Sequence, residues 1–174
     1  MIWSWLRRLD ARLRLLVPLA LAICAALLDV LPLQGLGAWG LTPFLLLCVV
    51  YFWSLYRPDL FGPIAAFGSG IVYDALSGLP LGLTALILLL VRQLVLVQHR
   101  FFVARSFLVV WSCFALLAPA VELARWLLAC AWWGRLFPAQ PIAMSLLVTV
   151  ALYPLASLVL TRIHNQVPRL VHAA

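Results

Sequence analysis

The sequence predicts an all-α integral membrane protein, a six-transmembrane helix bundle with both chain ends on the cytoplasmic side (N-in/C-in). Three observations predict it: an apolar composition, six apolar segments and a lopsided distribution of arginine. Of the 174 residues, 67% are hydrophobic and 10% are charged, and the mean hydropathy is +1.14. A soluble domain is typically about 45–50% apolar and about 25% charged. The composition therefore excludes a soluble globule, a nucleic-acid-binding module and a disordered tail, and most of the chain is expected to face lipid.

The apolar residues gather in six segments, each near the length needed to cross about 30 Å of hydrocarbon. Short connections that contain Gly, Pro or Arg separate them. We expect a single membrane-embedded domain over residues 1–174. Its predicted spans run from Leu15 to Leu33, Leu41 to Tyr56, Leu60 to Leu76, Leu81 to Val97, Phe107 to Trp133 and Ile142 to Leu160.

The first segment follows a basic stretch and so imitates a signal peptide, but its apolar run continues past Cys24, and we interpret it as a retained helix. The second and third segments are short, so a re-entrant hairpin remains an alternative to two full spans. The fourth segment begins at a tight turn formed by Ser77 to Pro80. Aromatic residues, among them Trp132 and Trp133 at the end of the fifth segment, suit the membrane interface.

Arginine predicts the orientation. The net charge is +7, and all twelve basic residues are Arg. With a cytoplasmic N-terminus, the inside connections hold nine topology-setting residues: Arg7, Arg8, Arg12, Arg14, Arg57, Arg100, Arg105, Arg162 and Arg169. Arg92 can extend to the same face, and the outside connections hold only Arg135. The positive-inside rule then places both termini inside, which requires an even number of spans. Because the basic residues lie in these connections, we expect no nucleic-acid partner.

The third segment carries a repeat of small residues. Gly62, Ala66, Gly70 and Asp74 recur every four residues, and the spacing continues through Gly78 and Gly82. Small residues four apart let another helix approach closely in a bilayer. We expect this stripe to be a helix-packing or partner interface, within the chain or with another protein.

Besides Arg92, which can extend to the inner face, four charged residues fall inside predicted spans, where insertion costs about 2.5–3.5 kcal/mol each. They are Asp29, Asp74, Glu122 and Arg125. All lie toward the outer side, so they are expected to form one intramembrane polar cluster. Two simpler interpretations stay open: Glu122 and Arg125 pair along one helix face, and the two Asp residues cap helix ends.

We expect no catalytic residue, no cofactor and no metal. The three His residues fall in inside connections, so no nucleophile–His pair follows. The four Cys residues have no C-x-x-C spacing. The connections are also too short to carry a site of their own.

The order of these features resembles the bacterial rod shape-determining MreD family. The most specific segment is Gly70 to Gly82, GIVYDALSGLPLG, with the pattern Gly-x-x-x-Asp-x-x-x-Gly-x-x-x-Gly. The basic N-terminus, Arg57-Pro58, Phe137-Pro138 and Leu152-Tyr153-Pro154 are similar as well. The resemblance covers nearly the whole chain, although outside the central segment it rests on hydropathy and length. The absence of Lys and the pair Glu122 and Arg125 have no counterpart in the family pattern.

The resemblance implies a non-enzymatic subunit of the cell-elongation machinery (elongasome) in the bacterial inner membrane, a membrane scaffold for peptidoglycan synthesis regulation. Its implied partners are an MreC-like protein, RodA, penicillin-binding protein 2 and the actin-like MreB, besides membrane lipid. With them it would help control lateral peptidoglycan synthesis and cell shape. The stripe of small residues would then contact a helix of the chain itself or the transmembrane helix of MreC.

A transporter subunit is the alternative from another functional class. Six short-looped spans also suit the substrate-binding component of an energy-coupling-factor vitamin transporter. In that case Asp29, Asp74, Glu122 and Arg125 would line a solute pocket. An enclosed outer pocket lined by all four side chains would favour transport, and a tightly packed interior would favour the scaffold.

Overall fold

The computed structural model describes residues 2–31, 42–102 and 106–166. These residues form six helices and no strand, which confirms the all-helical fold predicted from the sequence. The helices are α1 (Ile2–Val30), α2 (Leu45–Tyr56), α3 (Pro63–Ser77), α4 (Leu83–Phe102), α5 (Phe107–Trp133) and α6 (Gln140–Gln166).

The helices match the predicted segments in order, but only α5 has both predicted bounds, and at least one bound of every other helix differs. α5 occupies the same residues as the fifth segment, and α1 extends the first one back to Ile2. α2 begins at Leu45, four residues later than expected. Residue 41, the expected start of that segment, lies outside the described residues.

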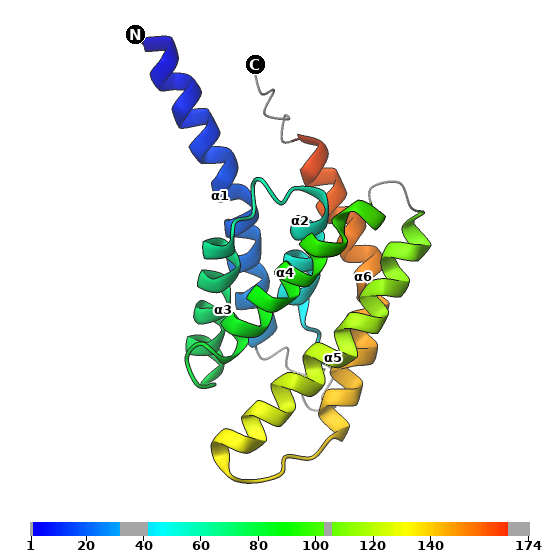
Figure 1. Ribbon diagram of the computed structural model, residues 1–174. Helices are drawn as coiled ribbons and strands as arrows, with labels where there is room; N and C mark the ends of the chain where they lie inside the picture. Colours follow the sequence, from blue (N-terminus) through cyan, green and yellow to red (C-terminus); the bar gives the residue numbers. More distant parts are fainter. Residues whose placement is uncertain (1, 32–41, 103–105, 167–174) are drawn as a thin grey trace.

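Successive helices run in alternating directions (Figure 1). The first turn of α1 and the last turn of α6 therefore lie at the same end of the molecule, together with the turn between α2 and α3. The turns between α3 and α4 and between α5 and α6 lie at the opposite end, which we call the Trp133 end.

The short helix α2 is the centre of the bundle. Every residue from Leu46 to Leu55 is buried, and Trp53 has no exposed surface. α2 packs against α1, α4 and α6, and the Tyr51 hydroxyl donates a hydrogen bond to the Val110 carbonyl of α5 over 3.1 Å. The buried side chains of α2 thus face the neighbouring helices rather than the bilayer.

The outer helices expose apolar side chains instead. Among the described residues, α5 and the stretch Gln140–Asn165 of α6 are each long and apolar enough to cross a membrane. Leu16–Val30, Leu45–Tyr56 and Leu83–Gln98 are apolar but shorter. Exposed leucines such as Leu116 and Leu147 suit lipid contact and would be costly in water.

Candidate functional site

Helices α3 and α4 form the most extensive helix pair, and the contact is closest at Gly70. A Cβ atom added there would lie 2.7 Å from the backbone nitrogen of Ala85 and closer still to its Cα. Such a separation is shorter than real contacts allow, so only glycine permits this approach. Ala66, one turn earlier in α3, is fully buried. The stripe of small residues is therefore used by a helix of the same chain.

Asp74 holds the beginning of α4. Its carboxylate accepts hydrogen bonds from the backbone N–H groups of Gly82 at 3.0 Å and Thr84 at 3.0 Å, with a longer contact from Ala85 at 3.4 Å. The first N–H groups of a helix have no partner within the helix itself. Asp74 is fully buried and supplies that partner from the adjacent helix.

Two glycines shape the turn between α3 and α4. Gly78 has φ +70° and ends α3, and Gly82 has φ +97° just before α4. Residues with a side chain rarely adopt these angles. Gly62, at the other end of α3, has open space around its Cα and makes no close approach.

Asp29 plays the same part for α2. It lies in the last turn of α1, and its two carboxylate oxygens accept hydrogen bonds from the N–H groups of Leu45 and Leu46, both at 2.9 Å. The preceding amide, Phe44 N–H, donates to the Thr149 hydroxyl of α6 at 2.8 Å. The start of the central helix is therefore fixed by α1 and α6 together.

Glu122 and Arg125 form an ion pair on α5. The distance from Arg125 Nη1 to Glu122 Oε1 is 3.3 Å, and Arg125 Nη2 donates a hydrogen bond to the Tyr73 hydroxyl at 2.9 Å. The guanidinium also lies 4.1 Å from the centre of the Phe44 ring, a cation–π contact. Arg125 thus joins α5 to α3 and to the start of α2.

Three of the four predicted charged residues line one cavity, and the fourth does not. This inner cavity has a volume of about 180 Å³, and its lining includes Asp29, Glu122, Arg125 and Tyr73. Asp74 lies elsewhere, on the amides of α4. Instead of the single cluster of four charged residues expected from the sequence, the structure brings three of them together, and the neutral Tyr73 lies beside them.

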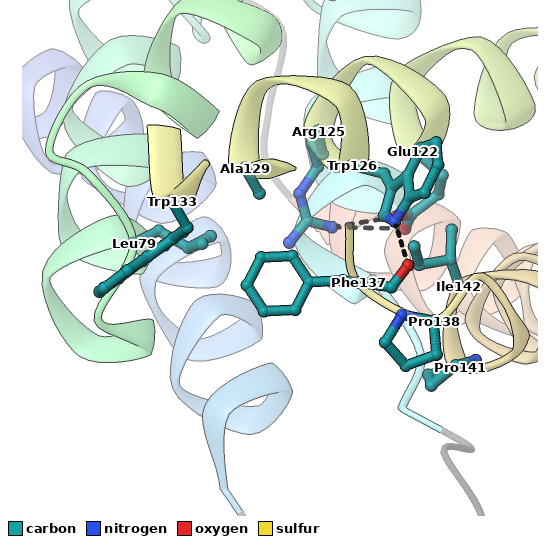
Figure 2. A pocket seen from close by; sticks show the side chains of 10 residues that line it. All are labelled: Leu79, Glu122, Arg125, Trp126, Ala129, Trp133, Phe137, Pro138, Pro141 and Ile142. Atoms are coloured by element: carbon teal, nitrogen blue, oxygen red, sulfur yellow. Dashed lines mark hydrogen bonds and ion pairs between the residues drawn. The ribbon is translucent and has the colours of Figure 1, made fainter. Parts of the chain in front are cut away.

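A second cavity, of about 330 Å³, adjoins the first at the Trp133 end. It shares Glu122, Arg125, Pro141 and Ile142 with the inner cavity. Its remaining lining is apolar and is shown in Figure 2: Leu79, Trp126, Ala129, Trp133, Phe137 and Pro138. We call this the aromatic cavity.

The connection after α5 folds back to form one wall of the aromatic cavity. The Trp126 indole N–H donates to the Phe137 carbonyl at 3.1 Å, drawn as a dashed line in Figure 2. The Arg135 guanidinium lies 4.7 Å from the centre of the Phe137 ring. This wall is held by polar contacts as well as by apolar packing.

The topology-setting arginines are only partly described. Arg57 is buried and its Nε lies 3.5 Å from the exposed Asp59 carboxylate. Arg92 is also buried, and its Nε donates to the Phe61 carbonyl at 2.9 Å. Arg162 is exposed in the last turns of α6. Arg105 and Arg169 lie outside the described residues, as do the side chains of Arg7, Arg8, Arg12, Arg14 and Arg100.

Three residues of the site were not among the sequence candidates: Phe44, Tyr73 and Thr149. In a chain this rich in aromatic and apolar residues, nothing local distinguishes Phe44 or Tyr73 from packing residues. Thr149 is a polar residue inside an apolar run, and this local pattern could have marked it as a candidate site residue. Within the described part of the chain, no group of three or more His, Cys, Asp or Glu side chains is placed to hold a metal ion.

Comparison with known proteins identifies one family. A family model described as rod shape-determining protein MreD matches residues 10–163. The match includes α2 to α5 whole, and with them every residue of the two cavities. No curated protein and no solved structure matches the chain.

Proposed function

The chain belongs to the MreD family of rod shape-determining proteins, and from that membership we propose that it is a non-enzymatic subunit of the bacterial elongation complex. The match over residues 10–163 is the observation that carries this proposal. The family is found in the bacterial inner membrane and determines cell shape. The chain would bind an MreC-like protein and, with RodA, penicillin-binding protein 2 and MreB, help control lateral peptidoglycan synthesis.

The proposal includes six membrane passages with both termini in the cytoplasm. The alternating directions of the helices support it, since the first turn of α1 and the last turn of α6 lie at one end (Figure 1). The distribution of Arg supports the same orientation. The Trp133 end would then face outward.

Contact with a partner helix is assigned to a groove between α1 and α6. Gly70 and Asp74 are already occupied by α4, so that stripe has no free face for a second helix. The groove has a volume of about 270 Å³, and its floor is formed by Leu45 and Val49 of α2. Ala25 and Ala156 lie in its walls and allow close approach. We propose that the transmembrane helix of MreC lies here.

The test is to fill the groove. Ala156→Trp should reduce co-purification of the MreC-like protein at least fivefold and should widen cells that depend on this chain for their shape. The matched control is Ala143→Trp, the same change at an exposed position of the same helix that lines none of the cavities described. Unchanged co-purification with Ala156→Trp in a folded, membrane-inserted protein would contradict the proposal that the MreC helix lies in this groove.

The transporter alternative has one observation on its side, the cavity shared by Asp29, Glu122 and Arg125. Asp74, the fourth residue it called for, is engaged elsewhere. The neighbouring genes discriminate between the two functions. An MreC-like gene beside this one supports the shape-determining role, and an energy-coupling ATPase supports transport.

A further inference from the structure

The inner cavity and the aromatic cavity together have the layout of a binding site for an amphiphile. They share four lining residues, Glu122, Arg125, Pro141 and Ile142, so they adjoin along one wall. Six of the ten residues that line the inner cavity carry a charge or a hydroxyl group, whereas eight of the ten that line the aromatic cavity are apolar. A molecule with a polar head and an apolar tail fits this division.

The polar part combines both signs of charge. Asp29 comes from α1, and Glu122 and Arg125 come from α5. The polar side chains that α3 and α6 contribute, Tyr73 and Ser145, are neutral. Two carboxylates thus face one guanidinium, and the amides of α2 offset part of the charge on Asp29. An ammonium group on a ligand would pair locally with these carboxylates, since a charge without a partner is costly where water is excluded.

Arg125 supplies the second requirement. The guanidinium lines both cavities. Its Nη1 bonds to Glu122, and its Nη2 donates one hydrogen bond to the Tyr73 hydroxyl. Each terminal nitrogen of a guanidinium carries two N–H donors, so Nη2 retains one for an anionic oxygen on the ligand, and the site calls for a cation and an anion on the same head group.

The apolar part accommodates a hydrocarbon chain. Trp126, Trp133 and Phe137 surround the aromatic cavity (Figure 2), and Trp133 is 53% exposed, so the cavity opens toward the surroundings of the bundle. In a membrane those surroundings are lipid. A lipid chain can therefore enter the cavity without passing through water.

We propose that the joined cavities bind an ethanolamine phospholipid from the leaflet at the Trp133 end. Its ammonium group donates hydrogen bonds to the carboxylates of Glu122 and Asp29, and a phosphate oxygen accepts from Arg125 Nη2. One acyl chain lies along Trp126 and Phe137. Phosphatidylglycerol lacks the ammonium group, and the trimethylammonium of phosphatidylcholine has no N–H to donate.

The experiment uses the purified full-length chain in detergent, stripped of lipid and titrated with each phospholipid under native mass spectrometry. Phosphatidylethanolamine should bind at least tenfold more tightly than phosphatidylglycerol or phosphatidylcholine of the same chain length. Glu122→Gln should remove that preference. Asp59→Asn is the matched control, because it removes an exposed carboxylate at the opposite end of the molecule and should leave the preference intact.

A second variant guards against an effect of Glu122→Gln on folding. Ile142 lines both cavities, so Ile142→Trp places a larger side chain where they meet without changing any charge. This variant should also abolish the preference for phosphatidylethanolamine. Equal binding of the three phospholipids, or an unchanged preference in both cavity variants, would overturn the proposal. Phosphoethanolamine without acyl chains should bind at least tenfold more weakly, and equally tight binding would identify a site for a free zwitterion instead. No partner protein is present, so failure here leaves the proposed shape-determining function standing.

Discussion

At the scale of single residues, the repeated pattern Gly-x-x-x-Asp-x-x-x-Gly-x-x-x-Gly divides into separate tasks. Gly70 removes a side chain where two backbones meet, Asp74 supplies an acceptor, and Gly78 and Gly82 take backbone angles that other residues avoid. The equal spacing arises because one helix face is followed directly by a turn. It does not make the four positions equivalent, so substitutions at each should have different effects.

Gly70→Ala should destabilise the protein through overpacking against Ala85. Forcing an extra methyl group into a filled contact typically costs about 1–3 kcal/mol, and the added Cβ would have to push α4 away. The free energy of unfolding, measured by denaturant titration in detergent micelles, should fall by about that amount. Gly70→Leu should be worse.

Gly68→Ala is the matched control for this prediction. It lies in the same helix, and nothing is within 4 Å of an added Cβ. Alanine favours helix over glycine by about 0.8–1.0 kcal/mol, so this variant should keep or slightly raise stability. Equal losses in the two variants would contradict the packing argument.

At the scale of helices, the first backbone amides of α2 and of α4 are bonded to carboxylates from other helices. Asp29 of α1 caps α2, and Asp74 of α3 caps α4. In a bilayer, no water is available for the free N–H groups at the start of a helix. A carboxylate from a neighbouring helix satisfies them and ties the two helices together at the same point.

Asp74→Ala should loosen the beginning of α4. The amides of Gly82 and Thr84 would lose their acceptor, and each unsatisfied buried group costs about 1–3 kcal/mol. Hydrogen–deuterium exchange over residues 82–86 should accelerate at least tenfold, while exchange in the centre of α5 should not change. Asp74→Asn retains one acceptor oxygen and should show a smaller effect. Unaltered exchange at residues 82–86 in the Ala variant would contradict the capping role.

The helices differ in how far their bounds could be predicted. α5 could be placed from the sequence because Ser106 and Gly134 interrupt the apolar run at both ends. The start of α2 could not, because it depends on contacts from Asp29 and Thr149, which lie 16 and 105 residues away along the chain from their partners Leu45 and Phe44. Local patterns carry no information about such contacts.

The same distinction applies to the candidate site. Charges in apolar segments are rare, so Asp29, Glu122 and Arg125 could be selected from the sequence. Which of them share a cavity depends on how the helices pack, and Asp74 is separated because its carboxylate is already bonded to α4. Tyr73 enters the site as the neighbour of Asp74 on α3, a position that the small-residue pattern alone does not mark.

At the scale of the whole molecule, α2 and α3 are shorter than a helix that crosses the hydrocarbon of a membrane by itself. α2 has 12 residues and α3 has 15, which correspond to about 18 and 22 Å of helix against about 30 Å of hydrocarbon. A short helix is acceptable at membrane depth where protein surrounds it. α2 is buried along its length. In the turn after it, backbone groups have hydrogen-bond partners within the protein: Phe61 N–H donates to the Arg57 carbonyl, and Arg92 donates to the Phe61 carbonyl.

This arrangement predicts that the turn between α2 and α3 reaches the cytoplasmic side, whereas a re-entrant hairpin would hide it or return it outward. In a variant whose four native cysteines are replaced by Ala, Asp59→Cys should react with a membrane-impermeant maleimide in inside-out vesicles only. Arg135→Cys, in the exposed connection between α5 and α6, should react in right-side-out vesicles only. Asp59 suits the test because its side chain is 47% exposed. Absent labelling of Asp59→Cys from either side would favour the re-entrant hairpin, and labelling of both positions from one side would rule out six passages, because an odd number of helices, α3 to α5, separates them.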